Sequence, residues 1–224
     1  PSLASVYALS KYDQERMCLM FGQAYRIPTV ALRFFNVYGT RQALSNPYTG
    51  VMAIFASRLL NGKPPVIFED GQQLRDFVSV HDVSYACALA LKSELAVGQA
   101  INVGCGQPRT VWDVAEAMAG ALGRGDIKPE LSGRSRAGDI RHCFADIRSA
   151  REILGFEPQV SFESGISELV EWLRGQQPKD FTERAQQERA LTTRQAVVGR
   201  VQQHEVDACL AAEDRQRSFG SGVR

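Results

Sequence analysis

The chain has 224 residues, of which 26 are Lys or Arg and 25 are Asp or Glu, so its formal net charge is +1. This balance argues against a dedicated nucleic-acid binder, because such proteins carry a basic surplus that displaces counterions from phosphates. The sequence has no run of about 18 or more apolar residues that would cross a bilayer, and no charged-then-apolar secretory leader opens it. We therefore expect a cytoplasmic protein without a membrane partner. Hydrophobic residues make up 44% of the chain, which is enough to build a packed core.

The cysteines and histidines are scattered, and the sequence has no C-x-x-C pair. The five cysteines are Cys18, Cys87, Cys105, Cys143 and Cys209, and the three histidines are His81, His142 and His204. Such spacing indicates reduced thiols rather than a disulfide framework, and it predicts no metal site.

Apolar periodicity alternates between helical and extended segments along the chain. The predicted helices are 5–25, 50–60, 81–93 and 110–122, with two more that begin at the capping residues Asp146 and Ser161, and the predicted strands are 29–35, 65–68, 77–80 and 99–103. Strands that alternate with helices predict an α/β fold with parallel strands.

The composition changes after about residue 176. Residues 176–224 are dominated by Gln, Arg, Glu, Ala and Thr and contain only isolated apolar side chains. We predict a polar, loosely helical or disordered tail there, next to a main region over 1–175. An amphipathic, partner-binding helix around 196–210 is the alternative.

The first candidate site is a Tyr and a Lys four residues apart in the first predicted helix, Tyr7 and Lys11. Residues at this spacing share one helix face, so the ammonium can lie beside the phenol. A neighbouring cation favours the phenolate and lowers the pKa of a tyrosine from about 10, which suits acid/base chemistry. A solvated pair without function is the alternative.

A strand follows this helix directly and ends in a polar residue and a glycine, over 32–39 (LRFFNVYG). Together with the Y-x-x-x-K helix, this segment resembles the extended short-chain dehydrogenase/reductase family of NAD-dependent nucleotide-sugar epimerases and dehydratases. Three later segments fit the same resemblance in order: 71–83 matches G-x-x-x-R-D-F-V-x-V-x-D-V, 102–106 matches N-V-G-x-G, and 136–139 (RAGD) is similar to R-P-G-D. The resemblance covers residues 1 to about 175.

The resemblance implies roles for six residues. Tyr7 would be the catalytic acid/base, and Lys11 would assist it and hold the nicotinamide ribose of NAD. Asn36 and Arg75 would bind the diphosphate of a nucleotide-diphospho-sugar, since a forked, permanently charged guanidinium suits that group. The alternatives are a strand-end turn cap for Asn36 and a surface salt bridge to Asp76 for Arg75.

Arg136 and Asp139 would contact the phosphate and ribose of the nucleotide, with a plain turn as the alternative. Arg33 lies inside an apolar strand, so we expect it to be paired or at a sheet surface. Met17, Met20 and Phe21 are predicted to be core, and because the equivalent helix joins two subunits in relatives, the same stripe is the candidate homodimer surface.

The sequence departs from the family pattern in its glycine loops, and these departures indicate which part of the family's fold is present. The sequence has no G-x-x-G-x-x-G loop, and in the Gly104-Cys105-Gly106 loop an arginine, Arg109, stands where a third glycine would be needed. We therefore predict the C-terminal part of a Rossmann-like doubly wound parallel sheet, with a smaller α/β substrate-binding lobe and without the N-terminal dinucleotide-binding half. Such a fragment would be inactive alone.

Within the family, the segment from Ala31 to Val83 looks closest to bacterial nucleotide-sugar 4-epimerases, including those acting on dTDP-6-deoxysugars. The resemblance thus implies 4-epimerisation by transient oxidation at C4 with NAD in the full-length protein. A 4,6-dehydratase or decarboxylase of the same family is one alternative. A non-catalytic sugar-nucleotide-binding module is the other.

Overall fold

The computed structural model describes residues 5–43, 50–134 and 140–176. All of them belong to the first of two compact units of the chain, Pro1–Asp180. The predicted tail beyond residue 176 lies outside the described residues, and so do the predicted site residues Arg136 and Asp139. No helix in the described ranges combines the length and apolarity that a membrane crossing requires.

The described part begins with a long helix, α1 (Val6–Tyr25). The Ser5 hydroxyl caps its start by accepting a backbone N–H of the first turn at 3.1 Å. Arg26 ends it in the left-handed conformation, at φ 56°, with its backbone N–H donating to the Gly22 carbonyl. The predicted helix over 5–25 is thus confirmed.

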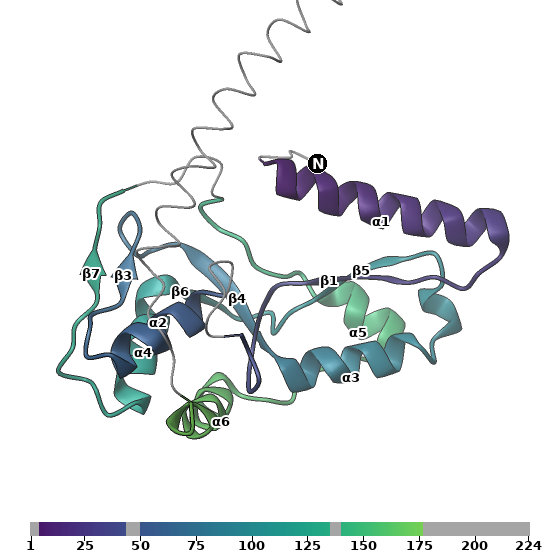
Figure 1. The fold of residues 1–224 in the computed structure, drawn as a ribbon. Helices are drawn as coiled ribbons and strands as arrows, with labels where there is room; N and C mark the ends of the chain where they lie inside the picture. The colour runs from purple at the N-terminus through teal and green to yellow at the C-terminus, as the bar shows by residue number, and fades with distance from the viewer. Residues whose placement is uncertain (1–4, 44–49, 135–139, 177–224) are drawn as a thin grey trace, which may run out of the picture. The chain divides into compact units, whose positions relative to one another are not determined.

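Two parallel strands, β1 (Ala31–Phe34) and β5 (Ala100–Val103), form the first sheet. Figure 1 shows α1 on one side of this pair, and α3 (Val80–Ala90) and α5 (Arg148–Leu154) on the other. Parallel strands covered by helices on both sides are characteristic of α/β proteins, so the predicted α/β class is confirmed.

A second sheet has the order β2 (Asn36–Tyr38), β4 (Leu74–Ser79), β6 (Pro108–Thr110), and a third pairs β3 (Val66–Ile67) with β7 (Glu130–Leu131). β2 is parallel to β4, β3 is parallel to β7, and β6 is antiparallel to β4. The described residues therefore form three small sheets, whereas we predicted part of a doubly wound parallel sheet with a smaller α/β lobe. The break falls at Phe35, whose N–H still donates to Val103 at 3.2 Å, whereas the next residue already pairs with β4.

The remaining helices are α2 (Val51–Leu60), the 3₁₀ turn Glu94–Ala96, α4 (Val111–Ala121) and α6 (Phe162–Arg174). Ser161 caps α6 as predicted, and Thr110 caps α4. The cap of α5 is Ile147 rather than the predicted Asp146, although the Asp146 carboxylate still accepts the Arg148 N–H at 3.1 Å.

Strand β4 lies between two cores. Phe77 belongs to a cluster built with α2, α4 and α6, whereas its neighbour Val78 belongs to a cluster built with α3, α5 and the first sheet. Successive side chains of a strand point to opposite faces, so one strand serves both clusters. Strand β4 therefore holds the two clusters in a fixed position relative to each other.

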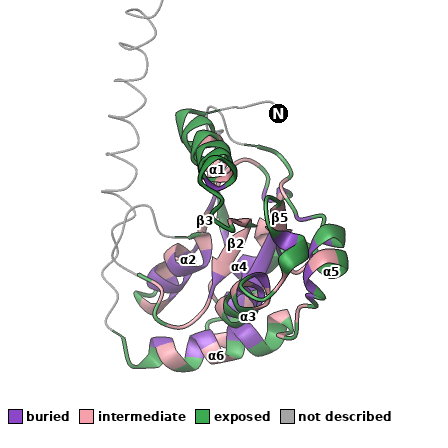
Figure 2. Cartoon of the chain, turned by 90° about the vertical axis from the view of Figure 1, so that its right-hand side faces the viewer, coloured by how far each residue is buried: buried purple, intermediate pink, exposed green. Residues whose placement is uncertain are grey.

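Helix α1 contributes almost nothing to either core. Gly22 is its only buried residue among those described, and Figure 2 shows most of the helix as exposed. Met17, Met20 and Phe21 are each more than half exposed, so the prediction that they are core is wrong. The homodimer that the same stripe suggested stays a prediction.

Candidate active site

Two contacts determine how α1 lies along β1. Gly22 packs so tightly on Thr29 that an added Cβ would lie 2.7 Å from the Thr29 Cβ. Seven residues earlier, the Glu15 carboxylate accepts hydrogen bonds from Nε and Nη2 of Arg33 at 2.5 and 2.7 Å. Seven helical residues span about 10 Å, and the four strand residues from Thr29 to Arg33 span about 13 Å. Helix α1 therefore runs antiparallel to β1, with its N-terminal end toward the carboxyl end of the strand.

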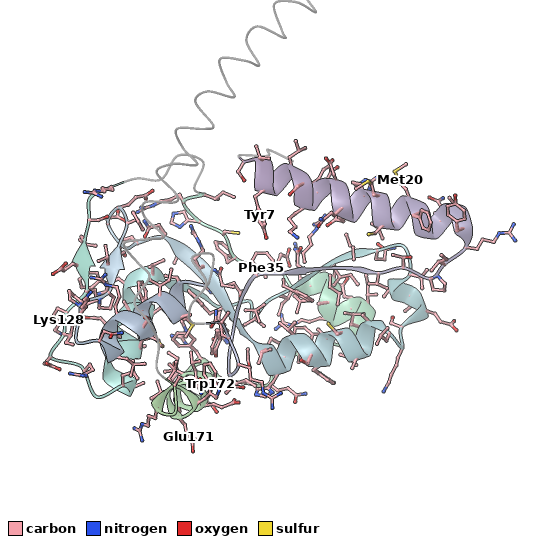
Figure 3. The ribbon with its side chains drawn as sticks, viewed as in Figure 1. Tyr7, Met20, Phe35, Lys128, Glu171 and Trp172 are labelled. Carbon is pink, nitrogen blue, oxygen red and sulfur yellow. The ribbon has the colours of Figure 1, made fainter. Side chains whose placement is uncertain are left out.

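The Glu15 contact confirms that Arg33 is paired, and it also orients the helix. Tyr7, Lys11 and Glu15 follow one another at intervals of four residues, so they occupy one side of α1, within a stripe about 80° wide. Because Glu15 faces β1, Tyr7 and Lys11 are turned toward the strands as well. Figure 3 shows the Tyr7 side chain leaving the first turn of α1 on the side where Phe35 lies.

The tyrosine and the lysine are neighbours in space. The Lys11 Nζ lies 5.6 Å from the centre of the Tyr7 ring and donates a hydrogen bond to Gln14 Oε1 at 3.2 Å. The Tyr7 side chain is 71% exposed, so the ring is open to a ligand. The spatial pairing that the four-residue spacing predicts is present.

The axial position of Tyr7 lies at the carboxyl end of β1. Tyr7 precedes Glu15 by eight residues, or about 12 Å along the helix axis. The same distance along an extended chain is three to four residues, so the phenol lies beyond Arg33, on the side where Phe35 lies. Asn36, which begins β2 directly after Phe35, has a side-chain amide that makes no hydrogen bond to any other described residue.

Asn36 and Arg75 lie on one face of the second sheet. Asn36 is paired in register with Phe77, and Arg75 precedes Phe77 by two residues on β4. Paired residues and residues two apart share a face, so the two side chains are diagonal neighbours, with Cα atoms about 7–8 Å apart. The structure thus brings these two predicted diphosphate ligands together.

Backbone carbonyls hold the Arg75 guanidinium. Its Nη1 donates to Leu74 at 2.8 Å and to Arg141 at 3.0 Å, and its Nη2 donates to Ile140 at 2.7 Å. These carbonyls orient the guanidinium, which is a forked cation of the kind that recognises phosphate groups.

Asp76 is not the surface partner of Arg75 that the sequence offered as an alternative. Its side chain is fully buried, and its carboxylate accepts the backbone N–H groups of Cys105 at 2.7 Å and Gly106 at 2.8 Å. The two carboxylate oxygens thus occupy the amides of the glycine loop that follows β5. The sequence signal for this arrangement is only the glycine pair itself, which indicates that something approaches the loop closely.

Arg141, which the sequence analysis did not single out, anchors the segment that contacts Arg75. Its guanidinium contacts Glu69 at 2.8 Å and both carboxylate oxygens of Asp70 at 2.7 Å. This guanidinium, together with the Gln72 backbone N–H, lowers the pKa of Asp70 to about 2. The ion pairs join the 140–142 segment to the turn before β4.

The loop geometry also tests whether NAD fits. A dinucleotide needs a glycine loop with free amides for its pyrophosphate. The amides of Cys105 and Gly106 already donate to Asp76, and the sequence contains no G-x-x-G-x-x-G loop. The described residues therefore do not fit the pyrophosphate of NAD. No group of three potential metal ligands occurs among them either.

Comparison with known proteins gives consistent matches. A model of the NAD dependent epimerase/dehydratase family matches residues 2–104. The dTDP-L-rhamnose 4-epimerase of Burkholderia thailandensis is 38% identical over 77% of this chain and 47% of its own length, and the UDP-glucose 4-epimerase of Mycolicibacterium smegmatis is 39% identical over 76% and 53%. The structure of the UDP-glucose 4-epimerase of Thermus thermophilus, a complex with NAD, aligns with a TM-score of 0.68 at 36% identity over 78% of this chain and 56% of that one. The chain thus spans about half the length of the curated relatives it matches.

The family match corrects one expectation. It begins at residue 2, and residues 2–104 fall in the N-terminal Rossmann part of the family. The prediction of a C-terminal portion that lacks the N-terminal half is therefore wrong, both as an identification and as a fold assignment. The six predicted site residues are not tested by these matches and stay predictions.

Proposed function

We propose that the chain, which matches the NAD dependent epimerase/dehydratase family model over residues 2–104 and is 38% identical to a dTDP-L-rhamnose 4-epimerase, carries the acid/base and substrate-binding residues of a nucleotide-diphospho-sugar 4-epimerase. The observation that carries this proposal is the pairing of Lys11 with the Tyr7 ring on a helix that Glu15 and Arg33 fix along β1, with Tyr7 toward the carboxyl end of the strand. The 4-epimerases named among the relatives favour epimerisation over dehydration or decarboxylation.

In this proposal Tyr7 exchanges a proton with a hydroxyl of the sugar. A phenol that is open to solvent and level with a strand end can reach a ligand at that edge. Lys11, beside the ring, holds a ribose hydroxyl. NAD supplies hydride chemistry when it is bound in this family, and we assign no residue of this chain to its pyrophosphate.

Asn36 and Arg75 bind the diphosphate of the substrate. An amide that has no other described partner and an oriented guanidinium on the same sheet face provide hydrogen bonds and positive charge together. Arg136 and Asp139 remain proposed contacts to the phosphate and ribose, and they lie outside the described residues.

The test measures binding and turnover separately. The chain is titrated with UDP-glucose and dTDP-L-rhamnose by calorimetry, and each is then incubated with added NAD while the configuration at C4 is followed by NMR. We expect Tyr7→Phe to leave affinity within about twofold and, in the full-length protein, to lower turnover by about 10²–10⁴-fold, the usual contribution of a general acid/base. Tyr25→Phe, which changes an exposed tyrosine at the other end of α1, is the matched control and should alter neither.

One observation favours a second candidate, a sugar-nucleotide-binding chain without turnover: the amides of the glycine loop are already occupied by Asp76. Binding without turnover, unaffected by Tyr7→Phe, would support this second function. A 4-keto product that absorbs in alkali would instead identify a dehydratase. Absence of nucleotide-sugar binding would contradict both proposals.

A further inference from the structure

A fully buried carboxylate joins three segments around Arg75. We propose that Asp76 is a positioning residue of the nucleotide-sugar site: it holds the 104–106 loop and the 140–145 segment against β4, and it thereby sets the orientation of Arg75. This inference rests on the function proposed above, because it concerns how the diphosphate ligand Arg75 is held.

The Asp76 carboxylate accepts three backbone N–H groups. Oδ1 accepts the Cys105 N–H at 2.7 Å, and Oδ2 accepts the N–H groups of Gly106 at 2.8 Å and Ala145 at 3.3 Å. A buried carboxylate is costly unless hydrogen bonds compensate for its lost hydration. Three amide donors from two separate segments provide that compensation, so both segments are held to the same side chain.

The fit around the carboxylate leaves no room for displacement. An added Cβ on Gly104 would lie 2.7 Å from Oδ2 of Asp76 and 2.5 Å from the Cβ of Ala145. The loop, the 140–145 segment and the carboxylate are therefore in mutual contact. A shift of any one of them moves the other two.

The 140–145 segment, whose last residue contacts Asp76, also contacts Arg75 through its earlier residues. Cys143 donates its N–H to the Leu74 carbonyl at 2.9 Å and forms a parallel bridge with Arg75. Because β6 pairs with Leu74–Asp76 on one edge of β4, Cys143 lies on the other edge, which β2 occupies farther along at Phe77–Ser79. At the start of the 140–145 segment, the carbonyls of Ile140 and Arg141 accept from the Arg75 guanidinium.

Asp76 thus holds the 140–145 segment at Ala145, and the carbonyls at the start of this segment orient Arg75. The two residues are consecutive on β4, so their side chains leave opposite faces of the strand. Removing the Asp76 carboxylate would release the segment at Ala145. We expect the carbonyls that hold the guanidinium to become mobile in consequence, and the affinity for a diphosphate to fall.

The chain offers a matched control in Asp82. Asp82 is 2% exposed and also accepts two backbone N–H groups, those of Gln159 at 2.9 Å and Val160 at 3.3 Å. It joins α3 to the loop before α6, away from Arg75. Asp82→Asn therefore removes a buried carboxylate of the same kind without touching the proposed site.

The experiment compares the wild-type chain, Asp76→Asn and Asp82→Asn. UDP and dTDP are titrated by calorimetry, thermal unfolding is recorded, and backbone hydrogen exchange is followed by NMR at Cys105, Gly106 and Ala145. We expect both variants to lower the unfolding temperature. Only Asp76→Asn should weaken nucleotide binding, by tenfold or more, and accelerate exchange of these three amides by a similar factor.

A wild-type measurement covers the case in which Asp76→Asn does not fold. Saturating UDP or dTDP should slow exchange at Ala145 and leave Gln159 and Val160 unchanged, because only the first amide belongs to the segment that holds Arg75. Equal exchange at Ala145 with and without nucleotide, or equal affinities in the two variants, overturns the positioning role. Failure of the wild-type chain to bind either nucleotide counts instead against the proposed function.

Discussion

Replacing Gly104 by alanine tests the packing between β4, the glycine loop and the 140–145 segment. The added Cβ would lie 2.5 Å from the Ala145 Cβ and 2.7 Å from Asp76 Oδ2. Both distances are far below van der Waals contact, and neither neighbour is the free end of a flexible side chain. The backbone at Gly104 is not in the left-handed region, so the whole effect comes from lack of space.

The magnitude follows from two opposing contributions. Replacing Gly by Ala at a compatible backbone conformation stabilises a protein by about 0.4–1 kcal/mol, because the unfolded chain loses freedom. Inserting a methyl group into a close-packed site costs about 1–3 kcal/mol. Because the added Cβ meets two atoms, we take the upper part of this cost, about 2–3 kcal/mol. The expected net loss is then about 1–2.6 kcal/mol, which in a domain of this size lowers Tm by roughly 2–10 °C.

The assay is thermal unfolding by circular dichroism, with Gly120→Ala as the matched control. Gly120 is exposed near the end of α4, and an added Cβ there meets no atom within 4 Å. The same substitution should raise stability by up to about 1 kcal/mol at this position, since alanine is the better helix former. A Tm of Gly104→Ala equal to or above that of the wild type would refute the tight packing on which the role of Asp76 depends.

Two further predictions concern ionisation. Burial raises the pKa of the Cys105 thiol to about 11, so at pH 8 only about one thiol in a thousand is ionised. Mass spectrometry should therefore find iodoacetamide on the exposed Cys18 long before it finds the label on Cys105. Equal labelling of the two cysteines at pH 8 would contradict this prediction. Arg141 lowers the pKa of Asp70 to about 2 from an ordinary 3.8, so this carboxylate adds stability above about pH 4 that is lost as the pH falls toward 2. In urea unfolding, Arg141→Gln should therefore differ from the wild type most at neutral pH and progressively less below pH 4, whereas a constant difference would speak against the pair.

The elements that the sequence predicts correctly depend on local information. The helix over 5–25 has its cap at Ser5 and its stop at Arg26 within the segment itself, and the pairing of Tyr7 with Lys11 needs only a spacing of four residues. The caps Thr110 and Ser161 are equally local. These features do not depend on where the rest of the chain lies.

Features that depend on distant partners were not predicted. The apolar residues of α1 have the spacing of a core face, yet Gly22 is the one buried residue described in this helix, and Met17 and its neighbours stay exposed. The apolar run over 29–35 reads as one strand. Only the position of β4 explains why the chain changes partner at Phe35.

The glycine loop shows why composition alone is ambiguous about ligands. A glycine pair between a strand and a helix indicates that a group approaches the backbone closely, and a phosphate is one such group. At 104–106 the group is the carboxylate of Asp76, which carries the charge of an anionic ligand but is supplied by the chain itself. The glycine requirement is therefore satisfied without a cofactor. The same contact joins this loop to β4 at the residue next to Arg75.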